Sequence, residues 1–277
     1  MSELLTARDA IARIPGWDPG QVRIETLYGG LTNRIFRVTR GREAFVLRLD
    51  AAHTQSFHLD RRIETAIMRA AAAAGLAPAI VHADAAAGIM LSEYLHGKVW
   101  SLPDLYDTAN LDAVGDLLRR VHALPLSGVR LDTQAVAHRY TTSLQDSPDL
   151  QSVALRCQAV IADLPATTKF CCCHNDVIAE NIIATPQLKL LDWEYACDND
   201  PLFDLASLVG FHQLGPVKAG ALLDAYAGGA DGELRERLAQ QVRVYDAIHW
   251  LWLANRQLLS HDRRQAAKLH ELQQRLK

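Results

Sequence analysis

The chain has 277 residues, of which 49% are hydrophobic and 22% charged, and its formal net charge is −3. These values are typical of a globular protein near the size at which one hydrophobic core gives way to two lobes. They exclude a strongly basic nucleic-acid-binding surface and a polybasic membrane arm, and no apolar run is long enough to cross a bilayer. We therefore expect no nucleic-acid partner, no membrane partner and no signal peptide. The oligomeric state stays open.

The first 91 residues alternate between strand patterns and turns. Hydrophobic periodicity predicts helices at residues 2–14 and 57–74, and strands at 22–27, 34–39, 44–49, 79–83 and 88–91. The strands together predict a five-stranded antiparallel sheet, so the fold class is α+β. Gly29 and Gly30 lie between the first two strands, where small residues let backbone N–H groups approach phosphate oxygens. A plain hairpin has the same pattern, and no G-K-[ST] follows, so this is not a Walker loop.

Two charged residues interrupt apolar patterns in this part of the chain. Arg48 lies inside the strand F-V-L-R-L-D, and a buried charge is costly unless it finds a partner. Glu64 lies on the apolar face of the following helix, so we infer an Arg48–Glu64 ion pair. Two alternatives remain open: Arg61 or Arg62 partners Glu64, or Arg48 faces solvent from an edge strand.

The rest of the chain is mostly helical in pattern, with helices expected at residues 110–124, 202–214 and 236–259, and one or two more within 133–163. His122 near the end of the first of these is expected to be structural. Trp250 and Trp252 belong to an H-W-L-W-L run, which fits core packing and equally a cation–π wall.

Three of the five cysteines stand in succession at positions 171–173. Successive side chains of a strand point to opposite faces, so we expect small buried strand residues here and no tetrahedral metal site. Unpaired cysteines fit a reducing compartment, and we expect a cytoplasmic location.

The stretch from Cys173 to Ala206 contains the residues that indicate chemistry. Asp176 and Asn181 fall on an irregular segment between apolar runs at 169–173 and 188–191, and Asp192 follows the second run. An Asp and an Asn that converge with a second Asp form a hard-oxygen site, which suits Mg²⁺ held largely by substrate phosphates. The remaining Asp can then act on a hydroxyl. A polar hairpin with a surface Asp and a capping Asn is the alternative.

The pattern H-x-D-x-x-x-x-N, followed by D-W-E-Y-A and P-x-x-D-L-A, resembles the choline/ethanolamine kinase family of kinase-like small-molecule phosphotransferases, which includes bacterial thiamine kinases. Aminoglycoside phosphotransferases are more distant relatives. The resemblance implies a bilobal protein-kinase-like fold, with a nucleotide-binding lobe at residues 1–91, a hinge at 92–97 and a mostly helical catalytic and substrate-binding lobe at 98–277. It also implies ATP and Mg²⁺ as cofactors.

The resemblance implies a role for each polar residue of this stretch. Asp176 would be catalytic, accepting or orienting the substrate hydroxyl, and Asn181 and Asp192 would hold Mg²⁺. His174 would brace the loop, and Asp204 would support it by accepting hydrogen bonds from backbone N–H groups.

The resemblance also implies where the nucleotide binds. The G-G-L-T-N loop would cover the phosphates, Arg48 would hold them where protein kinases have a Lys, and the backbone of the hinge would meet the adenine edge. The implied ATP-binding residues are Gly29, Gly30, Thr32, Asn33, Arg48, Glu64, Ser92 and Tyr94.

We expect the substrate to be a small cationic alcohol, choline or ethanolamine first and thiamine second. Trp250 and Trp252 would bind its cation, although the family usually spaces these tryptophans three apart, so at most one carries over and Trp250 is preferred. The resemblance implies that Glu194 and Tyr195, which follow Asp192 closely, would also help to bind the cationic substrate.

Three other functions fit parts of this pattern less well. An aminoglycoside kinase needs a broadly acidic substrate lip, whereas residues 231–277 contain more Lys and Arg than Asp and Glu. A pseudokinase-like nucleotide-binding or ligand-binding module is disfavoured because every catalytic position is occupied. A protein kinase is disfavoured because no D-F-G or A-P-E segment is present.

Overall fold

The computed structural model describes residues 5–29, 32–52, 54–57, 59–165, 167, 169–260 and 266–277. The chain divides into two compact units. The first contains Met1–Lys98 and Ile183–Tyr195, and the second contains Val99–Ile182 and Ala196–Lys277. The segment Ile183–Tyr195, which we expected within the second lobe, therefore belongs to the first unit.

The first unit is built on a five-stranded antiparallel sheet in the order β1-β2-β3-β5-β4, which confirms the predicted sheet. Its strands are β1 (Arg23–Gly29), β2 (Asn33–Arg40), β3 (Glu43–Asp50), β4 (Ile80–Asp84) and β5 (Ile89–Glu93). Strand β3 lies between β2 and β5, so Arg48 is opposite Ile35 on one side and Met90 on the other. Arg48 is therefore on an inner strand and not at an edge of the sheet.

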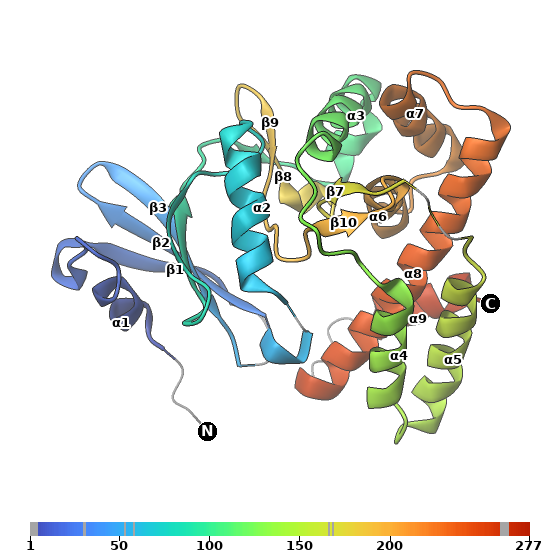
Figure 1. The fold of residues 1–277 in the computed structure, drawn as a ribbon, viewed down its shortest axis with the longest axis horizontal. Coiled ribbons are helices and arrows are strands. Elements are labelled where there is room, and N and C mark those ends of the chain that lie inside the picture. The colour runs from blue at the N-terminus through green and yellow to red at the C-terminus, as the bar shows by residue number, and fades with distance from the viewer. Residues whose placement is uncertain are drawn as a thin grey trace. The chain divides into compact units, whose positions relative to one another are not determined.

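Alternation along β3 sends its side chains to two different helices, which lie on opposite sides of the sheet in Figure 1. Leu47 and Leu49 pack in one hydrophobic core with Ile11 of helix α1 (Ala7–Ala12). Arg48 faces the other way and meets Glu64 of helix α2 (Arg61–Ala73). Helix α2 begins where the Asp60 side chain accepts hydrogen bonds from the first backbone N–H groups, a normal N-cap.

Short strands complete the first unit. The sheet β6-β8-β9 consists of β6 (Lys98–Val99), β8 (Ile182–Ala184) and β9 (Leu188–Leu190), and β6 and β8 include the points where the chain passes between units. The Leu190 N–H donates to the Leu76 carbonyl at 2.8 Å, just after α2. This bond ties the segment that carries Asp192 to the first unit.

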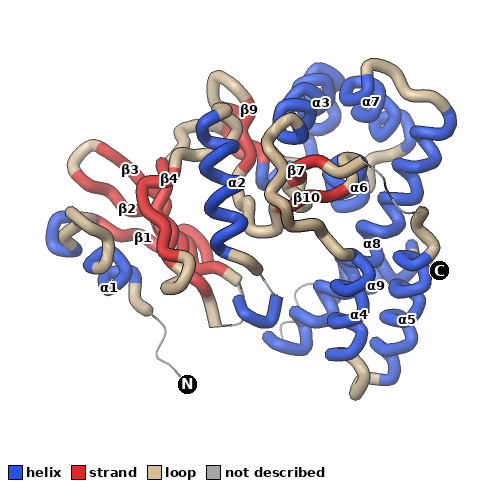
Figure 2. Tube along the Cα trace, viewed as in Figure 1, coloured by secondary structure: helices blue, strands red, loops and turns tan. Residues whose placement is uncertain are grey.

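The second unit is mostly helical. Its helices are α3 (Thr108–His122), α4 (Thr133–Ser143), α5 (Pro148–Ala162), α6 (Leu202–His212), α7 (Pro216–Ala227), α8 (Gly232–Ser260) and α9 (Ala266–Arg275). Figure 2 shows α4 and α5 side by side, and both pack against the long α8. Gly115 allows α3 and α7 to approach closely, because a Cβ there would lie 2.8 Å from the Ala225 carbonyl carbon. None of the helices within the described ranges is both long and apolar enough to cross a membrane.

A two-stranded ladder of β7 (Cys171–Cys173) and β10 (Cys197–Asn199) precedes the loop with Asp176. The pairs Cys197–Cys173 and Asn199–Cys171 are directly opposite. Cys171 and Cys173 share one face, and their Sγ atoms are 3.5 Å apart. The expectation of no tetrahedral metal site rested on alternation, which separates only neighbouring residues of a strand and leaves Cys171 and Cys173 on one face.

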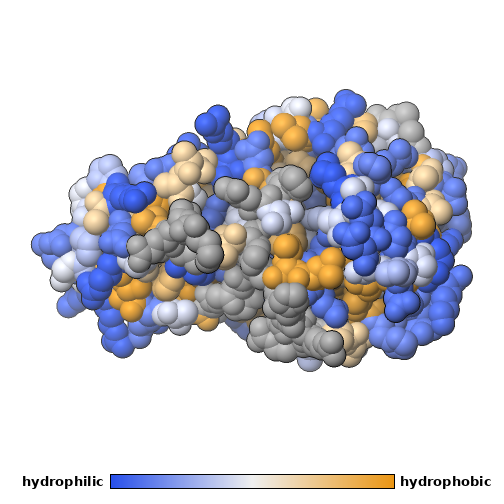
Figure 3. Space-filling model, turned by 90° about the horizontal axis from the view of Figure 1, so that it is seen from below, coloured by the Kyte–Doolittle hydropathy of each residue, from blue (hydrophilic) through white to orange (hydrophobic). Residues whose placement is uncertain are grey.

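The distribution of hydrophilic and hydrophobic residues on the surface is that of an ordinary globular protein. On the face drawn in Figure 3, hydrophilic residues predominate and hydrophobic residues lie in small groups among them. Large hydrophobic side chains that are exposed, such as Tyr106, Leu126 and Val217, come from separate parts of the second unit. Singly exposed apolar side chains are normal for a globular protein.

Candidate active site

Asp204 anchors the loop that follows β7. Its carboxylate is fully buried in the first turn of α6. It accepts hydrogen bonds from the backbone N–H groups of His174 at 2.9 Å and Asn175 at 2.6 Å, and from the His122 ring at 3.0 Å. A buried carboxylate needs such donors, and a negative charge is also stabilised near a helix N-terminus. The structure contains the backbone hydrogen bonds expected of Asp204, and the His122 ring bonds the same carboxylate.

Asn175 turns the chain immediately before Asp176. Its φ of 64° lies in the left-handed region, which Asn tolerates better than most residues. Its side chain is buried, accepting from the Asn199 amide at 2.8 Å and donating to the Cys197 carbonyl at 3.4 Å. His174 is also fully buried. The direction of Asp176 is therefore set by the turn at Asn175, which the hydrogen bonds to Asn199 and Cys197 of β10 stabilise.

Two more residues of α6 hold the same loop and were not recognised from the sequence. The Ser207 hydroxyl accepts from the Val177 N–H at 3.1 Å, and His212 Nε2 accepts from the Ala179 N–H at 2.9 Å. Burial lowers the pKa of His212, although nearby Glu180 opposes this, and a neutral ring is required for the nitrogen to accept. The sequence feature that could have identified Ser207 and His212 is their polar character in an otherwise apolar helix, three and eight positions after Asp204.

Asp176 and Asn181 contact each other. The Asn181 amide nitrogen donates to the Asp176 carbonyl at 2.9 Å and to its carboxylate at 3.0 Å. Asn181 is buried and Asp176 is half-buried, so the carboxylate is oriented and still accessible. Because the nitrogen makes both bonds, the amide oxygen of Asn181 is the atom suited to a cation. Two of the three predicted catalytic and metal-binding residues are thus brought together in the second unit.

Tyr245 of α8 is a buried aromatic residue of the second unit. Burial raises the pKa of Tyr245 well above the usual range, and the charge of Asp176 raises it further. Tyr245 also packs edge-on against Phe203 of α6 and lies 5.5 Å from the ring of His249. The ring of Tyr245 is therefore part of the packed interior of the second unit.

The preference for Trp250 as the substrate-binding tryptophan is wrong in this structure. Its indole is fully buried in the core of the second unit, so it offers no face to a ligand. Trp252 is half-buried, and the guanidinium of Arg256 lies 5.1 Å from its ring centroid. The core-packing interpretation therefore applies to Trp250, while the role of Trp252 stays a prediction.

The inferred Arg48–Glu64 ion pair is confirmed in the first unit. The guanidinium and the carboxylate meet in a two-pronged contact, one prong of which measures 2.7 Å. Burial disfavours both charges. The attraction of Glu64 outweighs it and raises the pKa of Arg48, just as Arg48 lowers the pKa of Glu64. Both groups stay charged, and this geometry fixes the arginine side chain.

Arg61 extends this pair into a network. Its guanidinium contacts Glu64 at 3.0 Å, Glu194 at 3.1 Å and Asp50 at 2.8 Å, and it donates to the Asn33 side chain at 2.9 Å. The Asn33 amide in turn donates to Glu194 at 2.7 Å. The side chains of Asn33 and Glu194, expected at the phosphates and at the substrate respectively, are instead partners of a buried arginine.

Asp192 belongs to the same unit. It follows β9 with φ = 59°, a left-handed conformation that turns the chain sharply, and the Trp193 indole N–H donates to the Leu190 carbonyl at 3.0 Å behind it. The charge of Asp192 adds to the influences that raise the pKa of Arg48. Tyr195 is half-buried at the end of the segment. The structure thus gathers Asp192 with Arg48 in one unit and Asp176 with Asn181 in the other, and a shared ion between Asn181 and Asp192 stays a prediction.

The remaining nucleotide-binding expectations have mixed outcomes. Gly29 ends β1 opposite Arg34, and Gly30 lies outside the described residues. The Thr32 carbonyl accepts from the Ala51 N–H at 3.0 Å and from the Thr54 hydroxyl at 2.6 Å, which fixes the start of β2.

The expected contact of the Tyr94 amide with adenine is wrong in this structure. The Tyr94 N–H already donates to the Ala44 carbonyl at 3.2 Å, so it is not available to a base. Ser92 is buried within β5, opposite Val46 of β3 and Ile80 of β4.

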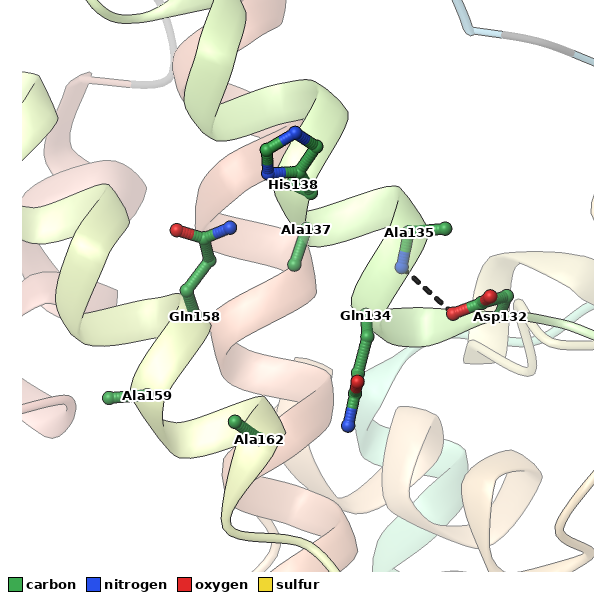
Figure 4. Close-up of a pocket in the computed structure, with 8 residues that line it drawn as sticks. All are labelled: Asp132, Gln134, Ala135, Ala137, His138, Gln158, Ala159 and Ala162. Atoms are coloured by element: carbon green, nitrogen blue, oxygen red, sulfur yellow. Dashed lines mark hydrogen bonds between the residues drawn. The ribbon is translucent and has the colours of Figure 1, made fainter.

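A shallow pocket between α4 and α5 contains none of the predicted site residues. Figure 4 shows it, with the Asp132 carboxylate accepting from the Ala135 N–H at 2.8 Å, an ordinary helix cap. The lining residues are Asp132, Gln134, Ala135, Ala137, His138, Gln158, Ala159 and Ala162. Four of these eight are alanines, so the pocket offers few groups for chemistry.

Comparison with known proteins identifies sequence relatives of this chain. Residues 23–240 match the phosphotransferase enzyme family. The protein LicA of Haemophilus influenzae is 28% identical over 211 residues, which cover 72% of this chain and 61% of LicA. The thiamine kinase of Salmonella heidelberg is 30% identical over 161 residues, which cover 57% of this chain and 55% of that enzyme. The matches therefore span about three-fifths of these relatives.

Solved structures show the same fold. A choline/ethanolamine kinase family protein from Mesorhizobium loti has a TM-score of 0.75 at 26% identity, covering 98% of this chain and 92% of that one. Choline kinase LicA from Streptococcus pneumoniae has a TM-score of 0.76 at 21% identity, covering 92% of each chain. These similarities confirm the predicted fold class and the resemblance drawn from the sequence motifs.

Proposed function

Because this chain belongs to the phosphotransferase enzyme family, we propose that it is an ATP- and Mg²⁺-dependent kinase that phosphorylates the hydroxyl of a small cationic alcohol. The observation that carries the proposal is the loop of the second unit. Asp176 is oriented there by Asn181, and Asp204 anchors the backbone just before it. Such an oriented carboxylate is what a hydroxyl acceptor requires.

In this proposal Asp176 accepts a hydrogen bond from the substrate hydroxyl and aligns its oxygen for attack. The proton would pass to the carboxylate as the substrate oxygen bonds the γ-phosphorus and the bond from that phosphorus to the ADP oxygen breaks, so that ADP leaves. Arg48, held rigid by Glu64, binds phosphate oxygens of the nucleotide and offsets the charge that develops on them. Most of the acceleration then comes from positioning and electrostatics.

The donor set fits Mg²⁺. Carboxylate and amide oxygens are ligands of the kind Mg²⁺ prefers, and the bonds made by the Asn181 nitrogen orient its oxygen as the atom for a cation. Asn181 and Asp192 would hold the ion. When bound, it would neutralise charge on the transferring phosphoryl group.

We further propose that residues 1–91 form the nucleotide-binding lobe, 92–97 the hinge and 98–277 the catalytic and substrate-binding lobe. The loop at Gly29 and Thr32 would lie over the phosphates, as the family resemblance implies. The carbonyl of Ser92 would face the adenine edge.

Choline or ethanolamine is the proposed acceptor. The carboxylate of Asp176 supports an ammonium substrate, because a cation is attracted to a negative charge. The half-buried Trp252 is the aromatic residue proposed to face that cation. The names of the relatives support this choice: one structural relative is a choline/ethanolamine kinase family protein. Thiamine is the second candidate, favoured by the 30% identity to a thiamine kinase.

The test is a coupled ADP-release assay with Mg²⁺–ATP and choline, ethanolamine, thiamine or a panel of aminoglycosides. Replacing Asp176 with Ala should lower kcat by about 10²–10⁴ while nucleotide affinity and folding are unchanged. Asp146→Ala is the matched control, since Asp146 is an exposed turn residue of the same unit. Turnover of Asp176→Ala close to that of the control would refute the proposed role. Binding of nucleotide with no product from any alcohol would instead support a pseudokinase-like module.

A further inference from the structure

A cluster of three potential metal ligands lies behind the loop that carries Asp176. Cys171 and Cys173 project from the same face of β7, with Sγ atoms 3.5 Å apart, and a ring nitrogen of His122 lies within 4.8 Å of both. All three residues belong to the second unit, so the cluster does not depend on the placement of the first. Sulfur and imidazole together are the ligands that Zn²⁺ prefers in proteins.

The His122 ring is oriented as metal-binding histidines usually are. Its Nε2 is 3.0 Å from the Asp204 carboxylate and its Nδ1 is 2.9 Å from the Tyr226 hydroxyl. A carboxylate only accepts, so Nε2 carries the proton and Nδ1 presents its lone pair toward Tyr226. A carboxylate that fixes the tautomer of a histidine in this way is the common outer-shell arrangement of zinc sites.

We propose that His122, Cys171 and Cys173 form a Zn²⁺ site, with the Tyr226 oxygen or a water as fourth ligand. Two sulfurs bound at about 2.3 Å to one tetrahedral zinc lie roughly 3.7–3.8 Å apart, close to the distance observed here. Binding would release the two thiol protons to solvent, and the metal would replace the Tyr226 hydroxyl at Nδ1. Cys171 is partly exposed, unlike the fully buried Cys173, which gives the ion a way in.

The proposed site is connected to the active loop through one residue. Asp204 bonds His122 on one side and the backbone of His174 and Asn175 on the other. Zinc at Nδ1 would make the imidazole Nε2–H a stronger donor to Asp204. We therefore expect metal binding to stabilise the anchor of the loop.

Cobalt supplies the direct test, because Co²⁺ in a tetrahedral thiolate site gives intense visible bands and a thiolate-to-metal charge-transfer band. The reduced full-length protein should bind Co²⁺ in a one-to-one ratio with these bands, and Zn²⁺ should displace it. Cys171→Ala and Cys173→Ala should each weaken binding by more than about tenfold, since losing only an outer-shell partner already costs roughly 10–100-fold. Circular dichroism of each variant establishes that it is folded.

Cys172→Ala is the matched control, because Cys172 is on the same strand and points to the opposite face; Cys157→Ala, in α5, is the second. Both should bind Co²⁺ as the unaltered protein does. The absence of thiolate bands, or bands that persist unchanged in Cys171→Ala, would overturn the proposal. Cys171→Ala carries this decision even if Cys173→Ala fails to fold, since Cys173 is fully buried and Cys171 is not. Activity is not needed for any of these readouts, so their outcome is independent of the proposed kinase function.

Discussion

Glu64→Gln is the substitution whose effect the structure predicts most directly. Glu64 is 1% exposed and accepts from both Arg48 and Arg61. Glutamine has nearly the same shape but no charge, and its NH2 group cannot accept from a guanidinium. The substitution therefore removes the negative charge and one acceptor while keeping the volume of the side chain.

The expected loss of unfolding free energy is about 3–5 kcal/mol, the usual effect of removing one partner of a buried ion pair. Arg61 retains Asp50 and Glu194, so most of the loss should come from Arg48. For a chain of this size, that loss corresponds to a Tm lowered by roughly 6–20 °C.

Urea denaturation followed by circular dichroism and tryptophan fluorescence measures the loss. Glu25→Gln is the matched control, because Glu25 forms an exposed pair with Arg23 in the same unit. Exposed pairs contribute about 0–1 kcal/mol. A double variant, Arg48→Met with Glu64→Leu, should recover much of the stability, because neither position then buries a charge.

The reasoning is refuted if Glu64→Gln loses no more stability than Glu25→Gln. It is also refuted if the double variant is less stable than the single one, because the loss would then come from packing and not from charge.

Three further predictions concern the second unit. Burial, with the charges of Lys268 and Arg275, lowers the pKa of His249 from 6.5 to about 3. The unfolded state therefore takes up a proton first as pH drops below about 6.5, and the free energy of unfolding should fall by up to about 1.4 kcal/mol per pH unit. His249→Gln should lose this part of the pH dependence between pH 7.5 and 5.5, as measured by urea titrations. Ser207→Ala leaves the Val177 N–H buried without its acceptor and should cost about 1–3 kcal/mol, which the same titration measures; a neutral effect would mean that the loop does not need this bond. Gly115→Ala should cost about 1–3 kcal/mol by forcing α3 from α7, whereas Gly232→Ala, with open space around its Cβ, should not; equal effects would contradict the close approach.

The sheet and the ion pair of the first unit were predictable because both leave local signals. Alternating apolar residues fix a strand and its two faces, so a single Arg48 in an apolar strand and a single Glu64 on an apolar helix face point to each other. Asp204 was predictable for the same reason, as a charge among apolar residues. The motif around Asp176 added the chemistry.

Long-range choices of partner left no such signal. Glu194 follows the predicted metal ligand closely, which suggested a substrate contact, yet its carboxylate pairs with Arg61, 133 positions earlier. The tryptophans of α8 fitted two environments equally well, and only packing shows that Trp250 is internal. Strands as short as β8 and β10 have too few residues for periodicity to reveal them.

The first unit is built from two segments that are far apart in the sequence, so it cannot be completed early in synthesis. The first unit begins at the N-terminus but is completed only by Ile183–Tyr195, after the chain has already produced all of α3, α4 and α5 of the second. Until Glu194 leaves the ribosome, Arg61 and Asn33 lack the carboxylate that they share. A nascent chain from which Glu194 has not yet emerged therefore lacks one acceptor of the buried Arg61 network, and a fragment cut at Lys98 would lack it permanently.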